Sequence, residues 1–413
     1  MNPRNPSYAW VVVALLVPVA LLNYLDRQML AAMKFSLMTD VPDIGSEANW
    51  GKILALFKWT YAFLSPIGGY LADRYSKRHV ISASLVVWSA VTWATGQVHS
   101  YDQLLFTRAV MGISEAFYIP AALALIADFH RGPTRSRAVG MHQMGIYAGV
   151  IIGGFSGYAA DNPQLGWRWM FELCGVIGIA YAIPLFLLVR NAPKVSEAKA
   201  EGSGPMAAVA ELLRNRSFIL LVLYFTLPAM AGWIVRDWMP AILKTEFGIG
   251  QGKAGVSATL YWMVAAVIAA ILGGWLADQW MRRNERGRIY TSALGMVLIS
   301  IAMMGVGYSP QTGLLQVAIA FLVLFGLGWG FFDCNNMPIL CQIAPPHLRA
   351  TGYGIMNLVS ISCGGLADWG FGFLRDHAVP LLAIFGIFAS VALVSVACVL
   401  LIRPTYRDTP SAG

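Results

Sequence analysis

Charged residues are scarce in this sequence. Asp, Glu, Lys and Arg together make up 12% of its 413 residues, whereas hydrophobic residues make up 57%. Soluble domains carry about 25% charged residues, and a helix that crosses a membrane needs roughly 20 consecutive, mostly apolar residues. The chain holds many runs of that kind, so its composition excludes an ordinary soluble protein and indicates a multi-pass membrane protein.

Cysteine is also rare, and the common catalytic signatures are missing. All five cysteines lie in or beside apolar runs, a placement typical of small buried residues rather than of a disulfide or metal framework. They are Cys174, Cys334, Cys341, Cys363 and Cys398. The patterns HExxH, GxxxxGK[ST] and GxSxG do not occur in a suitable context. We therefore expect no enzymatic activity, no cofactor and no bound metal.

The apolar runs number twelve, which predicts an all-α membrane protein with twelve transmembrane helices. The runs are 8–37, 51–73, 79–97, 103–128, 138–160, 169–189, 217–243, 254–278, 289–308, 313–343, 351–374 and 378–402.

Basic residues follow the even-numbered runs, and acidic residues gather in the opposite loops. The basic residues include Arg74, Lys77, Arg78, Arg135, Arg137, Arg190, Arg282, Arg283, Arg286 and Arg403, and the acidic ones are Asp40, Asp43, Glu47, Asp102 and Asp161. By the positive-inside rule, both termini lie in the cytoplasm and the acidic loops lie outside. The net charge of +8 is therefore a signal of orientation in a cell (inner) membrane, and we expect no nucleic-acid partner.

One polar segment, 190–216, interrupts the apolar pattern with Pro, Gly and Ser. It is typical of a cytoplasmic linker with a short surface helix. It predicts a six-helix bundle at 1–189 and a second six-helix bundle at 217–413.

The two halves resemble each other in sequence. "GGYLADRYSKR" at 68–78 returns as "GGWLADQWMRR" at 273–283, so that Asp73 and Asp278 are 278 − 73 = 205 residues apart. A weaker pair is "EAFYIP" at 115–120 and "DCNNMP" at 333–338, offset by 218 residues (333 − 115). Internal repeats in a membrane chain predict a transporter of two bundles, with its site between them near the midplane.

"GGYLADRYSKR" resembles the loop signature of the major facilitator superfamily, although Ser76 stands where that signature usually has Gly. The resemblance covers the whole chain and implies the major facilitator fold. "NYLDRQ" at 23–28 with "RAVMGISEAFYIPA" at 108–121 is similar to two groups of that family. One is the anion:cation symporters, which move sugar acids and other organic anions. The other is the spinster-like transporters, which are linked to lipids and other amphiphiles.

Asp26, Arg27, Arg108 and Glu115 are charged residues inside the first and fourth predicted membrane helices, where each costs at least about 2.5–3.5 kcal/mol. Asp26 is 26 − 8 = 18 residues into the first run, or roughly 27 Å along a helix. That helix starts inside, whereas the fourth starts outside, so Asp26 and Arg108 lie at similar depth. Glu115 follows Arg108 by two turns on the same face.

Adjacent helical residues point about 100° apart. We therefore expect one of Asp26 and Arg27 to meet the fourth helix and the other to face the central cavity. The alternative is a structural ion-pair cluster that joins the first and fourth helices. The family resemblance implies proton sites at Asp26 and Glu115, with Arg108 as partner, and a contact of Arg27 with the substrate or with these acidic residues.

Other polar side chains are candidates for substrate binding, with ordinary packing or interhelical hydrogen bonds as the alternative for each. Lys58 in the second helix shares a face with Tyr61; its alternative is to reach the outer interface. The full set is Tyr24, Lys58, Tyr61, Gln143, Tyr147, Asn335, Asn336 and Asn357. Arg236 and Asp237 are expected to form an interfacial pair, and Asp368 has no assigned role.

The loop signature predicts a latch on the cytoplasmic side, in which Asp73 binds basic residues or a helix N-terminus. Topology-setting charge is the alternative reading of these residues. The expected gating residues are Asp73, Arg74, Lys77, Arg78 and Asp278.

The sequence thus predicts a proton-coupled symporter of a small organic anion such as a sugar acid, working by alternating access. The alternative is a spinster-like, proton-linked transporter of a lipid or other amphiphile. We expect a monomer whose partners are protons, membrane lipids and a small anionic substrate.

Overall fold

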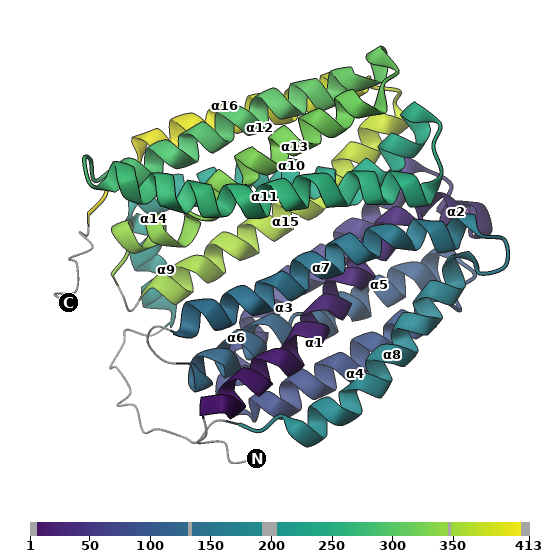
Figure 1. Ribbon diagram of the computed structural model, residues 1–413, viewed down its shortest axis with the longest axis horizontal. Helices are drawn as coiled ribbons and strands as arrows, with labels where there is room; N and C mark the ends of the chain where they lie inside the picture. Colours follow the sequence, from purple (N-terminus) through teal and green to yellow (C-terminus); the bar gives the residue numbers. More distant parts are fainter. Residues whose placement is uncertain (1–5, 131–133, 192–204, 346–347, 406–413) are drawn as a thin grey trace. The chain divides into compact units, whose positions relative to one another are not determined.

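The computed structural model of the chain describes residues 6–130, 134–191, 205–345 and 348–405 (Figure 1). Its regular structure is mainly α-helical, with a 3-10 turn at Pro42–Ile44. The helices are α1 Pro6–Ala32, α2 Lys34–Asp40, α3 Glu47–Arg74, α4 Lys77–Thr95, α5 Tyr101–Glu115, α6 Tyr118–Phe129, α7 Arg135–Asp161, α8 Gly166–Leu188, α9 Pro205–Arg214, α10 Arg216–Phe247, α11 Gln251–Met281, α12 Gly287–Thr312, α13 Leu315–Asp333, α14 Asn336–Ile343, α15 Arg349–Asp376 and α16 Leu381–Leu401.

The twelve predicted spans agree with these helices. In the described part of the chain, nine segments are long and apolar enough to cross a membrane. The other three predicted spans correspond to the more polar helices α3, α4 and α15. Helix α9 is the short helix expected in the 190–216 segment, whose residues 192–204 lie outside the described residues.

Two of the predicted spans are broken at positions that the internal repeat relates to each other. Helix α5 ends at Glu115 and α6 begins at Tyr118, whereas α13 ends at Asp333 and α14 begins at Asn336. A proline has no backbone N–H, and its ring clashes with the carbonyl four residues before it. Pro120 and Pro338 place this defect at Ala116 and Cys334, so each break directly follows a carboxylate.

The chain forms two compact units. The first consists of Met1–Glu197, Arg236–Thr259 and Asp368–Phe373, and the second of the remaining residues. Short pieces of α10, α11 and α15 therefore belong with the N-terminal helices. The predicted division into bundles at 1–189 and 217–413 stays a prediction.

In the first unit, α1 packs against α7, α4 against α8 and α3 against α5. The contact between α1 and α7 is close because three glycines recur every four residues on α7, at Gly145, Gly149 and Gly153. A Cβ atom on the first or third of these would lie 2.7 Å or 2.8 Å from a carbonyl oxygen of α1. Small residues at such positions allow two helix backbones to approach each other in a membrane.

In the second unit, α12 packs against α13 and α16. Aromatic rings fill much of its interior: Trp329 lies 5.7 Å from Phe325 and 5.3 Å from Phe332, measured between ring centroids. The uncharged aromatic packing fits a helix layer buried in a membrane protein.

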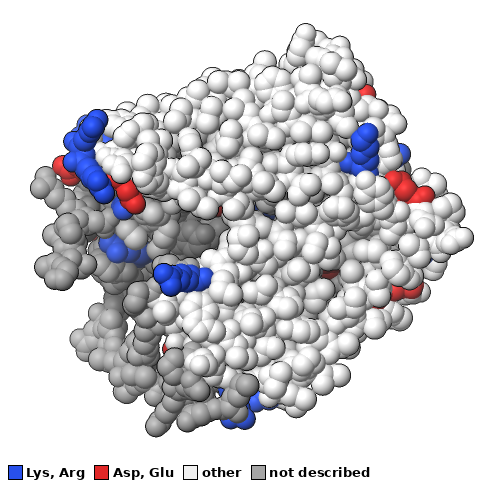
Figure 2. Space-filling model, in the orientation of Figure 1, with Lys and Arg blue, Asp and Glu red and all other residues white. Residues whose placement is uncertain are grey.

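Charged side chains lie near the ends of α7 and α11. On the face shown in Figure 2, Lys, Arg, Asp and Glu leave the middle lengths of α7 and α11 uncharged. Helix α7 carries its charges at Arg135, Arg137 and Asp161, and α11 carries Lys253 and Asp278. This distribution is the one expected of helices whose apolar middle crosses a membrane.

Candidate functional site

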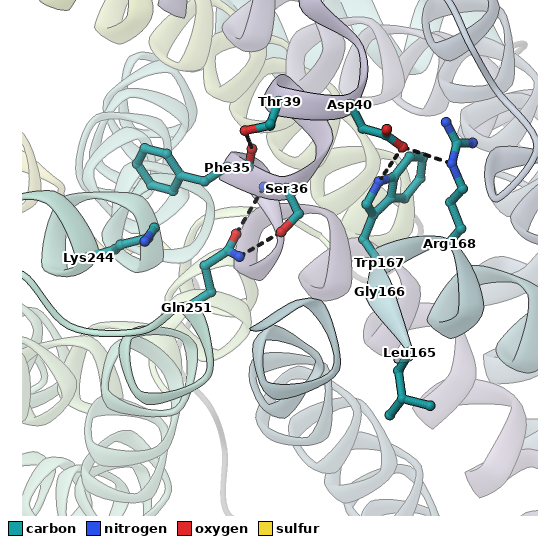
Figure 3. Close-up of a pocket in the computed structure, with 10 residues that line it drawn as sticks. All are labelled: Phe35, Ser36, Thr39, Asp40, Leu165, Gly166, Trp167, Arg168, Lys244 and Gln251. Carbon is teal, nitrogen blue, oxygen red and sulfur yellow. Dashed lines mark hydrogen bonds and ion pairs between the residues drawn. The ribbon is translucent and has the colours of Figure 1, made fainter. Parts of the chain in front are cut away.

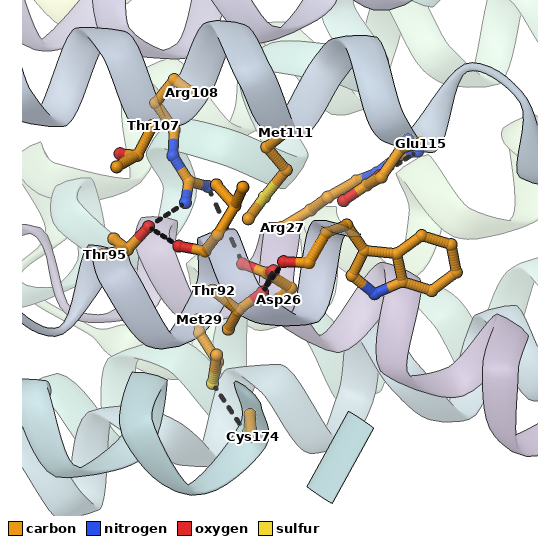
Figure 4. A network of polar contacts seen from close by, with 12 residues as sticks. Asp26, Arg27, Met29, Thr92, Thr95, Thr107, Arg108, Met111, Glu115 and Cys174 are labelled. Atoms are coloured by element: carbon orange, nitrogen blue, oxygen red, sulfur yellow. Dashed lines mark hydrogen bonds and ion pairs between the residues drawn. The ribbon is translucent and has the colours of Figure 1, made fainter. Parts of the chain in front are cut away.

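The packing of α1 decides where Asp26 and Arg27 point. Leu25 and Gln28 contact Gly153 on α7. Because consecutive helical residues are rotated by about 100°, the two residues between them are turned away from α7 and into the interior of the first unit. Figure 4 shows both side chains directed toward α5.

Arg27 forms an ion pair with Glu115, the last residue of α5. Its Nε lies 2.8 Å and its Nη2 lies 2.7 Å from the same carboxylate oxygen, Oε2. Nη2 also donates a hydrogen bond of 3.2 Å to Oδ1 of Asn23, one turn earlier on α1. The Glu115 side chain is fully buried and that of Arg27 is 10% exposed, so the pair is shielded from solvent in this structure.

Three aromatic rings surround the Arg27 guanidinium. Its Cζ lies 4.6 Å from the ring centroid of Tyr24, 4.7 Å from that of Phe57 and 4.9 Å from that of Tyr61. A cation over an aromatic face gains about 0.5–1 kcal/mol when exposed and about 2 kcal/mol or more when desolvated. These rings hold the guanidinium in place while its hydrogen-bonding edge remains directed at Glu115.

A second ion pair lies beside the first. Arg108 Nη1 is 3.7 Å from Asp26 Oδ1, and both side chains are buried. The Thr92 hydroxyl donates to Asp26 Oδ2, and Arg108 Nη2 donates to the Thr95 hydroxyl at 2.9 Å. Helix α4 thus supplies polar support to both members of the pair (Figure 4).

Several buried polar atoms in this network have no hydrogen-bond partner among the described residues. They are Asn23 Nδ2, Asp26 Oδ1, Arg108 Nε and Glu115 Oε1. Buried polar groups normally find partners. The network therefore offers unused hydrogen-bonding capacity to water, a proton or a ligand.

The predicted pairing of Asp26 with Arg108 is confirmed, but the prediction that only one of Asp26 and Arg27 meets the fourth helix is wrong. Both contact α5, at residues seven positions apart. The short Asp26 side chain pairs with Arg108. Although Arg27 starts from a backbone direction about 100° away, its side chain is long enough to reach Glu115 on the same helix.

Lys58 lies neither at the outer interface nor alone in a cavity. Its ammonium group pairs with the carboxylates of Asp237 on α10 and Asp368 on α15. The expected interfacial pair of Arg236 with Asp237 is therefore wrong, because Asp237 is buried and bound to Lys58. Sequence reasoning missed the role of Asp368, although a carboxylate in an apolar run is itself a signal of a buried partner.

The remaining substrate candidates are spread over both units. Tyr24 and Tyr61 are brought to Arg27, whereas Gln143 and Tyr147 are half-buried on α7. In the second unit, Asn335 donates to the Phe331 carbonyl at 3.0 Å, Asn336 donates to the Asp333 carboxylate at 3.4 Å and Asn357 donates to the Tyr353 carbonyl at 3.1 Å. Their roles in substrate binding stay predictions.

The predicted latch is only partly described. The side chain of Asp73 lies outside the described residues, and those of Arg74 and Asp278 are exposed. Lys77 forms an ion pair of 2.9 Å with Asp128, and the Arg78 guanidinium lies 4.2 Å from the Phe186 ring centroid. The gating roles of these residues stay predictions.

A hollow of about 530 Å³ lies apart from these residues, on the side predicted to be outside (Figure 3). It is lined by Phe35, Ser36, Thr39, Asp40, Leu165, Gly166, Trp167, Arg168, Lys244 and Gln251. Arg168 pairs with Asp40 at 2.9 Å, and the Gln251 amide donates to the Ser36 hydroxyl at 2.7 Å. None of the predicted site residues lines this hollow. The ion pair joins α2 to α8, and the hydrogen bond joins α2 to α11. Among the described residues, no cluster of His, Cys, Asp and Glu could hold a metal ion.

Two relatives show what the chain resembles. Protein spinster homolog 1 of Homo sapiens is 30% identical over 385 residues, covering 86% of this chain and 71% of that protein. The "Probable L-galactonate transporter" of Escherichia coli (strain K12) is 25% identical over 378 residues, covering 88% and 82%. The match to the spinster homolog 1 of Rattus norvegicus covers 56% of that protein at 28% identity, so this chain spans little more than half of its length.

Solved structures show the same fold. The crystal structure of a bacterial homolog to the human lysosomal transporter Spinster, inward-facing and unoccupied, has a TM-score of 0.75 at 20% identity, covering 96% of this chain and 95% of that chain. The structure of a D-xylose-proton symporter has a TM-score of 0.75 at 17% identity, covering 96% and 98%.

Residues 16–367 match the profile of the Major Facilitator Superfamily. That match takes in the loop signature, the internal repeat and the ion-pair network of α1 and α5. The chain belongs to the Major Facilitator Superfamily, as the sequence predicted.

Proposed function

We propose that this protein is a proton-coupled symporter of a small organic anion, such as a sugar acid, and that it works by alternating access. The proposal includes an inner-membrane location, cytoplasmic termini and a monomeric state. The observation that carries it is the ion pair of Arg27 with Glu115, enclosed by the rings of Tyr24, Phe57 and Tyr61.

The charges of the network support the coupling of an anion to a proton. Asp26 and Glu115 carry two negative charges, and Arg27 and Arg108 carry two positive ones, so their formal sum is zero. An anionic substrate at Arg27 adds one negative charge to a site of low dielectric, where unbalanced charge is strongly disfavoured. A proton on Glu115 restores neutrality and releases Arg27 to the substrate carboxylate.

Glu115 is suited to take that proton. Its Oε1 is buried and has no hydrogen-bond partner among the described residues. The residue also ends α5, and the C-terminal end of a helix carries partial negative charge that disfavours a further anion. Loss of solvation favours the neutral form of a carboxyl group, and a nearby arginine favours the charged form. A change in water contact or in the position of Arg27 therefore changes the fraction of Glu115 that carries a proton.

The alternative is proton-linked transport of a lipid or other amphiphile. The higher identity with protein spinster homolog 1, 30% against 25% for the galactonate relative, favours it. The aromatic rings around Arg27 fit an apolar substituent next to an anionic group equally well.

Thermal-shift measurements separate the two substrate classes, because a ligand that binds the folded state raises its stability. We would test galactonate and gluconate against a single-chain phospholipid, with Arg27→Ala as the control. The proposal predicts a stabilisation by a sugar acid that Arg27→Ala abolishes. Stabilisation by the phospholipid alone would favour the alternative, and stabilisation that persists in Arg27→Ala would contradict an anion site at Arg27.

A further inference from the structure

Lys58, Asp237 and Asp368 form a buried triad that the substrate site does not include. They come from α3, α10 and α15, and all three belong to the first compact unit. The Lys58 ammonium bonds to Oδ2 of each carboxylate. Asp368 is 0% exposed, Lys58 3% and Asp237 6%, so solvent does not screen these charges in this structure.

Close backbone packing encloses the triad. A Cβ atom on Gly51 of α3 would lie 2.8 Å from the Cα of Trp369, and one on Gly372 of α15 would lie 3.0 Å from the Cα of Ala48. The two helices therefore touch through their main chains, one turn or less from Asp368. Such a contact leaves no layer of water between α3 and α15.

The charge of the triad is unbalanced. One ammonium and two carboxylates sum to −1, unlike the neutral network of α1 and α5. Lys58 and Asp237 supply the charges that act on Asp368, and the Trp238 side chain on α10 also interacts with this carboxyl group. The nearby cation Lys34 on α2 pairs with Glu47 on α3, and the Arg236 guanidinium on α10 lies 5.6 Å from the Tyr24 ring centroid on α1. Burial of a net charge is strongly disfavoured unless it is neutralised.

We propose that the triad is a second proton-binding site, separate from Glu115, at which Oδ1 of Asp368 takes the proton. This oxygen is buried and has no hydrogen-bond partner among the described residues. The proton forms an O–H bond at Oδ1, and the formal charge of the triad changes from −1 to zero. A metal cation would fit less well, because the Lys58 ammonium already lies between the two carboxylates.

The site links proton binding to the contact of α3 with α10 and α15, on the side predicted to be outside. When these helices separate, water solvates the carboxylates. The buried negative charge that favoured protonation of Asp368 is then exposed, so the proton is released. Closure of this contact therefore takes up one proton and is favoured at low pH, whichever substrate is carried.

Infrared spectroscopy of the purified full chain tests the proposal through the C=O stretching band of a protonated, buried carboxylic acid. We would use the Glu115→Gln background, which removes the carboxyl group of the proposed coupling site, so that the two proposals fail independently. The expected result is a pH-dependent band that shifts in D2O, is lost in Asp368→Asn and remains in Asp237→Asn. Glu47→Gln is the matched control, since it removes another buried lysine's partner on α3, and it should keep the band.

The choice of two variants at Asp368 guards against a folding artefact. Asp368→Asn mimics the neutral acid and leaves Lys58 balanced by Asp237, so we expect it to fold. Asp368→Glu keeps the carboxyl group and should show the band at a shifted frequency. An unchanged band in Asp368→Asn, a band lost in Asp237→Asn instead, or a band abolished by sodium at constant pH would each overturn the proposal.

Discussion

Arg27 holds Glu115 through a single carboxylate oxygen. Its Nε and Nη2 lie 2.8 Å and 2.7 Å from Oε2, whereas Oε1 has no hydrogen-bond partner among the described residues. One side of the carboxylate is therefore bound to a cation while the other can accept a proton. Protonation weakens the attraction of Glu115 for Arg27, and a substrate anion at Arg27 has the same effect on the pair. This mutual competition is the physical basis of the proposed coupling.

Arg27→Ala should weaken substrate binding by roughly ten- to a hundred-fold. A hydrogen bond to a charged group contributes about 1.5–3 kcal/mol, and about 1.4 kcal/mol corresponds to tenfold in affinity. Arg27→Lys should restore only part of this affinity, because the planar fork of the guanidinium is lost. The measurement is equilibrium binding of the identified substrate. Wild-type affinity in Arg27→Ala would contradict the proposal that Arg27 binds the anionic group of the substrate.

Asp26→Asn and Arg108→Gln should each destabilise the protein, and the double variant should lose less than the sum of the two. Removing one partner of a buried ion pair costs about 3–5 kcal/mol, and the two side chains here are both buried. Asp128→Asn is the control, because its pair with Lys77 is partly exposed and such pairs contribute about 0–1 kcal/mol. Thermal unfolding in detergent measures all four variants. Additive losses would show that Asp26 and Arg108 do not interact.

Gly112→Ala should destabilise the contact of α5 with α3 by about 1–3 kcal/mol, the usual effect of overpacking. Its Cβ would press against the Phe57 carbonyl and the Thr60 hydroxyl and lie 3.1 Å from the Tyr61 backbone nitrogen. Displacement of the rings of Phe57 and Tyr61 should also weaken substrate binding. Gly140→Ala is the control: its Cβ meets nothing within 4 Å, so the helix should gain about 0.5–1 kcal/mol. Equal stability of the two variants in thermal unfolding would contradict the packing argument.

The orientation in the membrane predicts which loops a reagent reaches. A cysteine at Asn162, beside the acidic loops, should react with an impermeant thiol reagent applied outside intact cells. A cysteine at Asn191, beside the basic loops, should react only after the membrane is opened. Each is introduced into a chain whose five native cysteines are replaced by serine or alanine. Labelling of Asn191→Cys from outside would reverse the predicted topology.

Features that depend on local chemistry could be predicted from the sequence. The pairing of Asp26 with Arg108 could be predicted from the rise of a helix, since each residue lies in one continuous helix. The family could also be recognised from the sequence, because its loop signature is a short contiguous segment.

Features that depend on long-range packing could not be predicted in this way. Lys58 finds its partners 179 and 310 residues away in the chain, and no local pattern connects them. The ion pair of Arg27 with Glu115 was included only in the alternative of an ion-pair cluster between the first and fourth helices. The expectation that one of Asp26 and Arg27 faces the cavity was wrong because the angle between adjacent residues was treated as deciding the partner, whereas a long flexible side chain overcomes that angle.

The central claim is that Glu115 carries the coupled proton, and Glu115→Gln tests it because glutamine mimics the protonated form. The decisive measurement compares two modes of substrate movement in proteoliposomes: accumulation driven by an imposed pH gradient, and counterflow exchange without a gradient. The account predicts that Glu115→Gln loses gradient-driven accumulation but keeps counterflow, since exchange needs no net proton movement. Gradient-driven accumulation by Glu115→Gln at the wild-type level would contradict it, because the proton would then travel through another group.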